Sequence, residues 1–270
     1  MMITAERAGA RVARAAIARQ HPPMPREHGA WGILFIPFAT AVAVSGVFDL
    51  KVALLLVSIL CFYIARASYL KHNIKWTAIL LAGSILFALA LIVKWSLWGL
   101  IGFGAVAAPL AFRQNGRSAI AQVIAVCGLT LTAPAAWYVA TGQINAKALW
   151  LWLLNALYFV GGVFYVKMHI AAAARRKPLQ SLREKAAIGG STLLHSAGLS
   201  VCLAALIAGK AIPPVVCGAY LPGVARAIAG IGRLSPTLRI KRLGWTEVAY
   251  SIVFAAALIA SLRWSNWGDG

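Results

Sequence analysis

Long apolar runs alternate with short polar segments along most of the chain. Because the hydrocarbon core of a bilayer is about 30 Å thick, a helix needs about 20 mostly apolar residues to cross it. Nine runs come close to that length, and each predicts a transmembrane helix. They cover residues 29–48, 52–68, 76–93, 96–112, 118–140, 148–166, 188–208, 211–230 and 245–263. The pattern therefore predicts an all-α, polytopic membrane helical bundle with nine transmembrane helices.

Several of these runs contain proline, including Pro37, Pro109, Pro134 and Pro222. Proline lacks a backbone donor and kinks or breaks a helix in water. Inside a membrane bundle it is tolerated, because neighbouring groups satisfy the freed carbonyls. We therefore treat each run as one span.

The distribution of lysine and arginine between the runs predicts the orientation of the helices, since short cytoplasmic loops are enriched in both. With the N-terminus in the cytoplasm, the inner segments hold 21 of the 26 basic residues. The outer segments hold one each, namely Lys51, Lys94, Lys147, Lys210 and Arg263. An error in the number of spans would disturb this alternation. We therefore expect a cytoplasmic N-terminus and an external C-terminus.

The residues before the first run are polar and basic, with Arg7, Arg11 and Arg14 on one face of any helix. No short apolar core with a small-residue cleavage site follows, so a cleaved signal peptide is not expected. We predict a basic cytoplasmic tail over residues 1–24 and a single transmembrane domain over residues 25–265.

Composition agrees with a membrane protein. Hydrophobic residues make up 61% of the chain and charged residues 12%, which excludes an ordinary soluble domain. The formal net charge is +20, but the basic residues lie between apolar runs. Contact with anionic lipid head groups therefore explains them better than nucleic-acid binding. The four cysteines lie within apolar runs without a CxxC pair, so neither a metal site nor a disulfide framework is expected.

The most concentrated group of ionisable residues is Arg26-Glu27-His28, at the start of the first run. Ionisable groups close to membrane depth usually face a cavity and have a partner. We predict Glu27 and His28 as acid/base residues if the protein is an enzyme, with Arg26 as a ligand-binding or head-group contact. On a regular helix the three side chains point in different directions, so they cannot all face one pocket.

Other candidate ligand-binding residues lie at the predicted cytoplasmic ends of later runs. Arg66 and Arg226 could pair with a glutamate or with a phosphate, and Glu247 begins the last run. Lys167 follows a face formed by Asn155, Tyr158 and Tyr165. His195 would share a face with Glu184 and Ser191 if that helix began early. A structural hydrogen bond to Ser191 or Thr192 is the alternative role for His195.

Common catalytic motifs are missing from the chain. It contains no HExxH, Walker A or GxSxG sequence, and no Cys/His spacing typical of metal sites. Magnesium-diphosphate chemistry needs several carboxylates close together. In the loops around residues 66–75 and 167–187, Glu184 is the single acidic residue. We therefore expect no metal and no cofactor.

The run Pro25-Arg26-Glu27-His28-Gly29-Ala30-Trp31, followed by a proline-containing helix and a basic loop at Arg66, resembles the start of the YwiC-like family of bacterial membrane proteins. We expect the similarity to extend across the chain, and it implies a multi-pass protein of the bacterial cell (inner) membrane. The resemblance to that family does not imply any particular activity.

The predicted topology also resembles, more distantly, the UbiA-type intramembrane prenyltransferases. Those enzymes bind magnesium and a prenyl diphosphate through aspartate-rich motifs after helices two and six. The matching stretches here, 66–73 and 165–169, contain no aspartate. The resemblance therefore implies a UbiA-like bundle without magnesium-dependent prenyl transfer.

Three functions remain open. The first is a bundle that binds an isoprenoid or a lipid with an anionic head group in a cytoplasm-facing pocket, with Arg66, Lys167 and Arg226 as charge partners. The second is a small-solute or proton-coupled transporter with Glu27, His195 and Glu247 along its path. The third is a structural or assembly factor for another membrane complex. Membrane lipids are the expected partners in each case, and the sequence does not indicate an oligomeric state.

Overall fold

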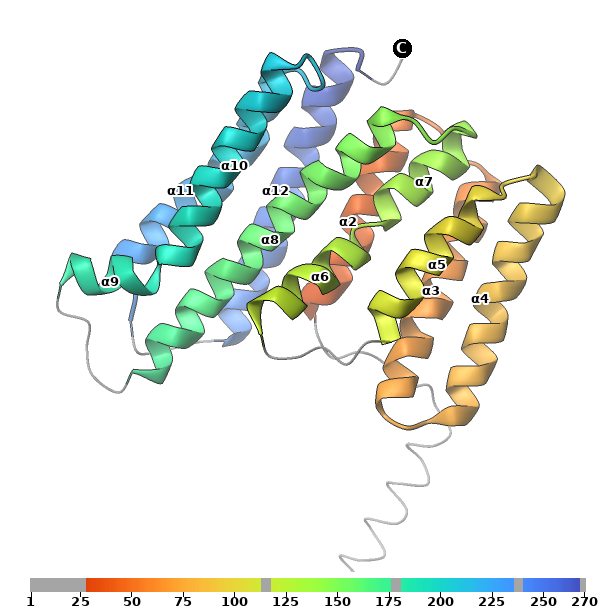
Figure 1. Cartoon of the computed structure of the whole chain (residues 1–270), viewed down its shortest axis with the longest axis horizontal. Coiled ribbons are helices and arrows are strands. Elements are labelled where there is room, and N and C mark those ends of the chain that lie inside the picture. Colours follow the sequence, from red (N-terminus) through yellow and green to blue (C-terminus); the bar gives the residue numbers. More distant parts are fainter. Residues whose placement is uncertain (1–27, 113–117, 176–180, 236–239, 268–270) are drawn as a thin grey trace, which may run out of the picture. The chain divides into compact units, whose positions relative to one another are not determined.

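The computed structural model describes residues 28–112, 118–175, 181–235 and 240–267, and regular structure in these ranges is helical throughout. The predicted all-α class is therefore confirmed for the described part of the chain. Figure 1 shows the helices and their labels. Their bounds are α2 His28–Ser45, α3 Leu50–Leu70, α4 Ile74–Trp95, α5 Gly99–Phe112, α6 Ala119–Leu129, α7 Thr132–Thr141, α8 Ala146–Ala174, α9 Leu182–Ile188, α10 Gly190–Ala208, the 3₁₀ turn η1 Pro214–Val216, α11 Cys217–Gly232 and α12 Ile240–Trp264.

Seven helical segments within the described ranges are long and apolar enough to cross a membrane. The protein is thus a multi-pass membrane protein. Two further predicted spans coincide with shorter apolar helices, Gly29–Ser45 and Gly99–Leu110. The predicted N-terminal tail lies outside the described residues.

The fifth predicted span is two helices rather than one, because α6 ends at Leu129 and α7 begins at Thr132. Pro134 has no N–H to donate to the carbonyl of Thr130, and its ring would clash with that carbonyl in a regular helix. The Thr130 carbonyl instead accepts from the N–H of Ala133. Proline therefore interrupts this span without changing its position along the chain.

Short polar side chains cap several helices. The side chains of Asn73, Ser118, Asn145 and Ser181 each accept a hydrogen bond from a backbone N–H in the first turn of α4, α6, α8 and α9. Such caps satisfy donors that have no partner inside the helix. They help to fix the residues at which these helices begin.

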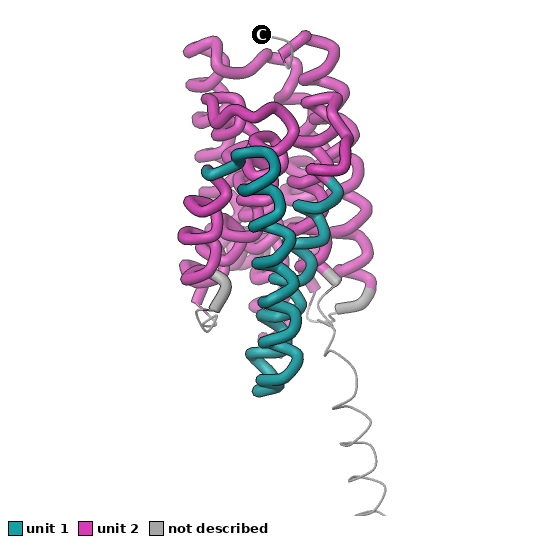
Figure 2. The backbone as a smooth tube through the Cα atoms, turned by 90° about the vertical axis from the view of Figure 1, so that its right-hand side faces the viewer, with its two compact units in different colours: residues 1–27, 53–98 teal, residues 28–52, 99–270 magenta. Residues whose placement is uncertain are grey.

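The chain divides into two compact units, coloured in Figure 2. The described part of the first unit is residues 53–98, which contains α4 and most of α3. Here Ser58 donates a hydrogen bond to the carbonyl of Ser84 over 2.8 Å. A Cβ at Gly83 would lie 3.7 Å from the sulfur of Cys61. Small residues thus let the two antiparallel helices pack closely.

The second unit comprises residues 28–52 and 99–270, and helix α8 lies at its centre. Helices α2, α6, α7, α10 and α11 all pack against α8, and Figure 1 shows it running between α2, α6 and α7 on one side and α10 to α12 on the other. Leu151, Leu154 and Asn155 of α8 are fully buried. The candidate site lies along this helix.

Candidate functional site

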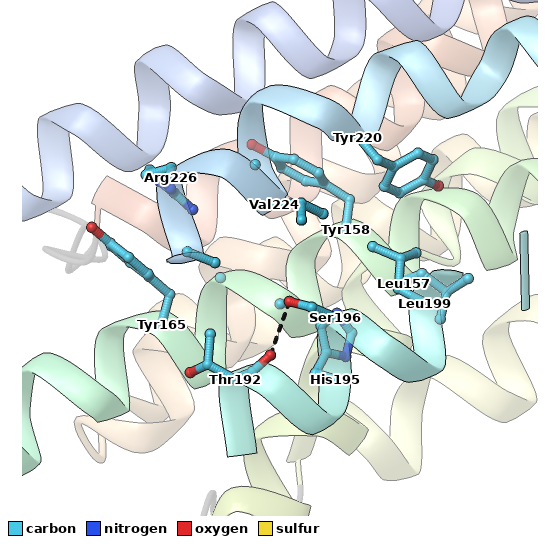
Figure 3. Close-up of a pocket in the computed structure, with 14 residues that line it drawn as sticks. Leu157, Tyr158, Tyr165, Thr192, His195, Ser196, Leu199, Tyr220, Val224 and Arg226 are labelled. Atoms are coloured by element: carbon cyan, nitrogen blue, oxygen red, sulfur yellow. Dashed lines mark hydrogen bonds between the residues drawn. The ribbon is translucent and has the colours of Figure 1, made fainter. Parts of the chain in front are cut away.

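A cavity lies within the second unit between α8, α10 and α11 (Figure 3). Its volume is about 30 Å³, which is room for one or two water molecules. Figure 3 shows Tyr165 and Arg226 toward one end and Leu157 and Leu199 toward the other. The residues that line it are Leu157, Tyr158, Gly161, Gly162, Tyr165, Thr192, His195, Ser196, Leu199, Tyr220, Gly223, Val224, Arg226 and Ala227.

Two adjacent glycines of α8 let ionisable side chains approach the helix backbone. A Cβ at Gly161 would lie 2.9 Å from Nε2 of His195, and one at Gly162 would lie 3.3 Å from Oε2 of Glu247. Any larger residue would therefore push against His195 or Glu247. The Gly161–Gly162 pair brings groups from α10 and α12 to the same stretch of α8.

An ion pair between α11 and α12 borders the cavity. Nη1 of Arg226 donates to Oε1 of Glu247 over 2.5 Å, and the two side chains are 10% and 19% exposed. The guanidinium carbon lies 4.3 Å from the ring centre of Tyr165 and 4.6 Å from that of Tyr250. Both rings can stabilise the cation through their π faces. The pair is therefore held in a largely desolvated setting, where losing one partner would leave a buried charge.

Three polar groups of residues that line the cavity have no hydrogen-bond partner among the described residues. They are Nε of Arg226, the hydroxyl of Tyr158 and the hydroxyl of Thr192, a residue only 2% exposed. Buried polar groups in proteins are nearly always hydrogen-bonded. The cavity residues thus offer three donors, from α8, α10 and α11, to a bound molecule.

His195 lies on the α10 side of the cavity, with its ring centre 5.6 Å from that of Phe164. The Thr192 hydroxyl has no partner among the described residues, so Thr192 is not the side-chain partner of His195, and a bond to Ser191, the other predicted partner, stays a prediction. The proposed shared face with Glu184 is also not formed, because α9 ends at Ile188 and α10 begins at Gly190. His195 and Glu184 therefore belong to different helices.

A second group of buried polar side chains lies further along α8. Asn155 is fully buried, and its Nδ2 donates to Oγ1 of Thr40 in α2 and to the carbonyl of Leu151. Thr40 donates in turn to the carbonyl of Pro37. On α7, Thr132 donates to the carbonyl of Leu34 over 3.0 Å. These bonds join α2, α7 and α8 beside the proline of α2.

The structure brings three of the sequence-predicted residues together. His195 and Arg226 line the cavity, and Glu247 joins them through its bond to Arg226. Lys167 lies in α8 but does not line the cavity. Arg66 belongs to the first unit.

The N-terminal candidates are not placed with the others. Arg26 and Glu27 lie outside the described residues, and His28 is the first residue of α2. The acid/base role of Glu27 and His28 and the ligand-binding role of Arg26 therefore stay predictions.

Sequence reasoning missed Thr192 as a cavity residue, as well as Gly161 and Gly162. The glycine pair within an aromatic-rich run was the available signal, because adjacent glycines weaken a helix and then need a packing reason. The described residues contain no cluster of three or more His, Cys, Asp or Glu side chains that could hold a metal ion.

Comparisons with known proteins agree with part of the sequence analysis. The family model of YwiC-like proteins matches residues 24–137. The resemblance carried by residues 25–31 is confirmed over that range, although the match does not extend across the chain as expected. An uncharacterized protein of Haemophilus influenzae is 24% identical over 194 residues, which cover 69% of this chain and 73% of that protein. No solved structure matches the chain significantly.

The region matched by the family model ends before α8 begins. The cavity and the Arg226–Glu247 pair therefore lie outside it. The resemblance to UbiA-type enzymes finds no support in these comparisons.

Proposed function

We propose that this protein is a proton-coupled transporter of a small polar solute in the bacterial inner membrane. The observation that carries the proposal is the Arg226–Glu247 ion pair beside a cavity whose lining residues include three unpaired donors. Ionisable residues at membrane depth are costly, and they commonly mark substrate or proton pathways. Protonation of Glu247 would break its ion pair with Arg226 and leave Arg226 available to bind a solute. Proton uptake and solute binding would therefore be coupled.

The proposed topology has nine transmembrane helices, with the N-terminus in the cytoplasm and the C-terminus outside. Helix α2 has 18 residues and so measures about 27 Å at 1.5 Å per residue, close to the bilayer core. Helix α5 is shorter, but counting both preserves the alternation of basic segments along the chain. In this topology the ion pair lies in the cytoplasmic half of the bundle.

Polar groups also continue along α8 beyond the cavity, in the direction of its N-terminal end. Tyr220 donates to the carbonyl of Leu154, and Asn155 donates to Thr40. A solute that leaves the cavity toward the outside would meet these groups rather than a purely apolar barrier. They support a route across the membrane.

The size of the cavity favours a small solute over an isoprenoid or lipid. A volume of about 30 Å³ accepts a group of only a few atoms. Arg226 is also paired with Glu247, so its charge is already partly neutralised in this state. Binding of an anionic lipid in a UbiA-like bundle stays a prediction, as does an assembly role.

The test is solute-driven proton movement in liposomes that contain the purified protein and a trapped pH-sensitive dye. Amino acids, sugars, short carboxylates and inorganic anions are added one at a time. We expect at least one solute to change the internal pH, and the change to disappear in Glu247→Gln. The transport proposal is wrong if no solute gives a response above that of protein-free liposomes while circular dichroism shows folded protein.

A further inference from the structure

We propose that the cavity binds a small oxyanion, such as a short carboxylate, and that Glu247 takes up a proton as the anion binds. This rests on the transport function proposed above and assigns its substrate class. Three properties of the site carry the inference: its unpaired donors, its size and its charge.

The donors come first. The N–H at Nε of Arg226 and the hydroxyls of Thr192 and Tyr158 belong to residues that line the same cavity, and all three are buried without partners among the described residues. An oxyanion can accept from any of these donors, and a bond from the guanidinium would be charge-assisted. A cationic solute would instead face the positive charge of Arg226. The available hydrogen bonds therefore select an acceptor with negative charge.

Size limits the anion further. Gly161 and Gly162 carry no side chain, but His195 and the carboxylate of Glu247 occupy the space next to them. The remaining volume of about 30 Å³ suits the head of a formate or acetate ion. A bulkier anion would have to displace a wall of the cavity.

The charge of the site requires that a proton be taken up when the anion binds. The Arg226–Glu247 pair is neutral as a unit, and adding one anion would leave a net negative charge at membrane depth, which is expensive. If Glu247 binds one proton, the guanidinium can exchange the Glu247 carboxylate for the anion. One proton and one anion then enter together, and the net charge of the site does not change.

Other titratable groups near Glu247 must be distinguished from it. They are Arg226 on α11, His195 on α10, Tyr250 on α12 itself, and Tyr158 and Tyr165 on α8. Helix α2 also packs on α12 and carries no ionisable side chain from Gly29 to Ser45. Of these groups only His195 normally titrates close to neutral pH, so it needs its own variant.

The test is calorimetric titration of the purified full chain with sodium acetate and sodium formate, in two buffers of different ionisation enthalpy. The wild type should take up about one proton per anion, and its affinity should rise as the pH falls. Glu247→Gln mimics the protonated state, so it should bind the anion without proton uptake and independently of pH. His195→Gln should retain the proton uptake.

A matched pair of hydroxyl variants on α10 tests the donor. Thr192→Val should weaken acetate binding about tenfold, as expected for a lost hydrogen bond to a charged ligand. Ser200→Ala is the control, because Ser200 is exposed on the same helix and donates to the carbonyl of Ser196. Its affinity for acetate should equal that of the wild type.

The inference is overturned if acetate and formate give no binding heat with folded protein, if Glu247→Gln still takes up a proton, or if Thr192→Val binds like Ser200→Ala. The liposome assay separates this failure from that of the transport proposal. If a neutral solute drives Glu247-dependent proton movement while the anions do not bind, transport stands and the substrate class is wrong. If the anions bind with proton uptake but are not carried, the site stands and transport is wrong.

Discussion

Two buried polar regions along α8 differ in what their side chains leave unpaired. At the cavity, the charged pair Arg226–Glu247 coexists with unpaired donors on Arg226, Thr192 and Tyr158. At the neutral cluster of Asn155, Thr40 and Thr132, the donors are used within the protein, and the unpaired atom is the acceptor Oδ1 of Asn155. Both regions are buried and polar, but only the cavity offers donors and a charge that can change.

The comparison suggests which residues affect the binding of a solute and which affect its proposed movement across the membrane. Internal hydrogen bonds between helices are the ordinary use of polar residues in a bilayer. A charged pair with spare donors next to a cavity is unusual and costly. We therefore expect changes at the cavity to alter equilibrium binding, and changes at the neutral cluster to alter stability and the rate of transport.

The largest expected effect is loss of one member of the ion pair. Arg226→Leu leaves the Glu247 carboxylate buried without its partner, which should destabilise the fold by about 3–5 kcal/mol. The double variant Arg226→Leu/Glu247→Leu should recover most of that stability, since no charge remains buried. Thermal or detergent-induced unfolding of the purified proteins measures both. Equal instability of the single and double variants would show that the uncompensated charge is not the cause.

A smaller effect is expected from Gly161→Ala. The new Cβ would meet Nε2 of His195 at 2.9 Å, so His195 must shift and the cavity must lose volume. We expect acetate affinity to fall about tenfold, or about 1.4 kcal/mol, while stability holds or rises, since alanine favours helix over glycine. Calorimetry and thermal unfolding on the same samples give both values.

Gly198→Ala is the control for this variant, because Gly198 lies on α10 and a Cβ there would have no atom within 4 Å. Its acetate affinity should not change. If Gly161→Ala binds acetate as well as Gly198→Ala does, the α8 side of the cavity is not part of the binding site.

Asn155→Leu should act on the neutral cluster alone. The leucine keeps a similar volume but loses the bonds to Thr40 and Leu151, at a cost of about 1 kcal/mol in a membrane bundle. Acetate binding should stay unchanged in calorimetry, while solute-driven proton movement in liposomes should slow. Weaker acetate binding in this variant would mean that the two regions form one site.

The sequence predicted the fold class and the positions of the helices well, because long apolar runs have few structural solutions in a membrane. It did not predict the break between α6 and α7, since proline is tolerated inside many spans and only local packing decides where a helix ends. The candidate site was partly predictable. His195, Arg226 and Glu247 stood out as ionisable residues in apolar surroundings.

Thr192 and the glycine pair could not be predicted in the same way. Threonine and glycine are common in membrane helices, and their importance here comes from what other helices place against them. Gly161 matters because His195 of α10 fills the space beside it, and Thr192 matters because nothing described bonds to its hydroxyl. Such properties depend on how three helices pack against one another. The periodicity of the sequence along one helix does not predict those contacts.

The smallest expected effect is that of Thr132→Val. Valine matches the shape of threonine but cannot donate to the carbonyl of Leu34, a bond that joins α7 to α2 near Pro37. Because a single interhelical hydrogen bond in a bilayer is worth about 0.6 kcal/mol, unfolding should shift by about that amount, with no change in acetate affinity. Thr141→Val is the control, since Thr141 is exposed and bonds to the carbonyl of Trp137 in its own helix. If Thr132→Val weakens acetate binding as strongly as Thr192→Val, the neutral cluster takes part in binding, and the distinction between the two regions fails.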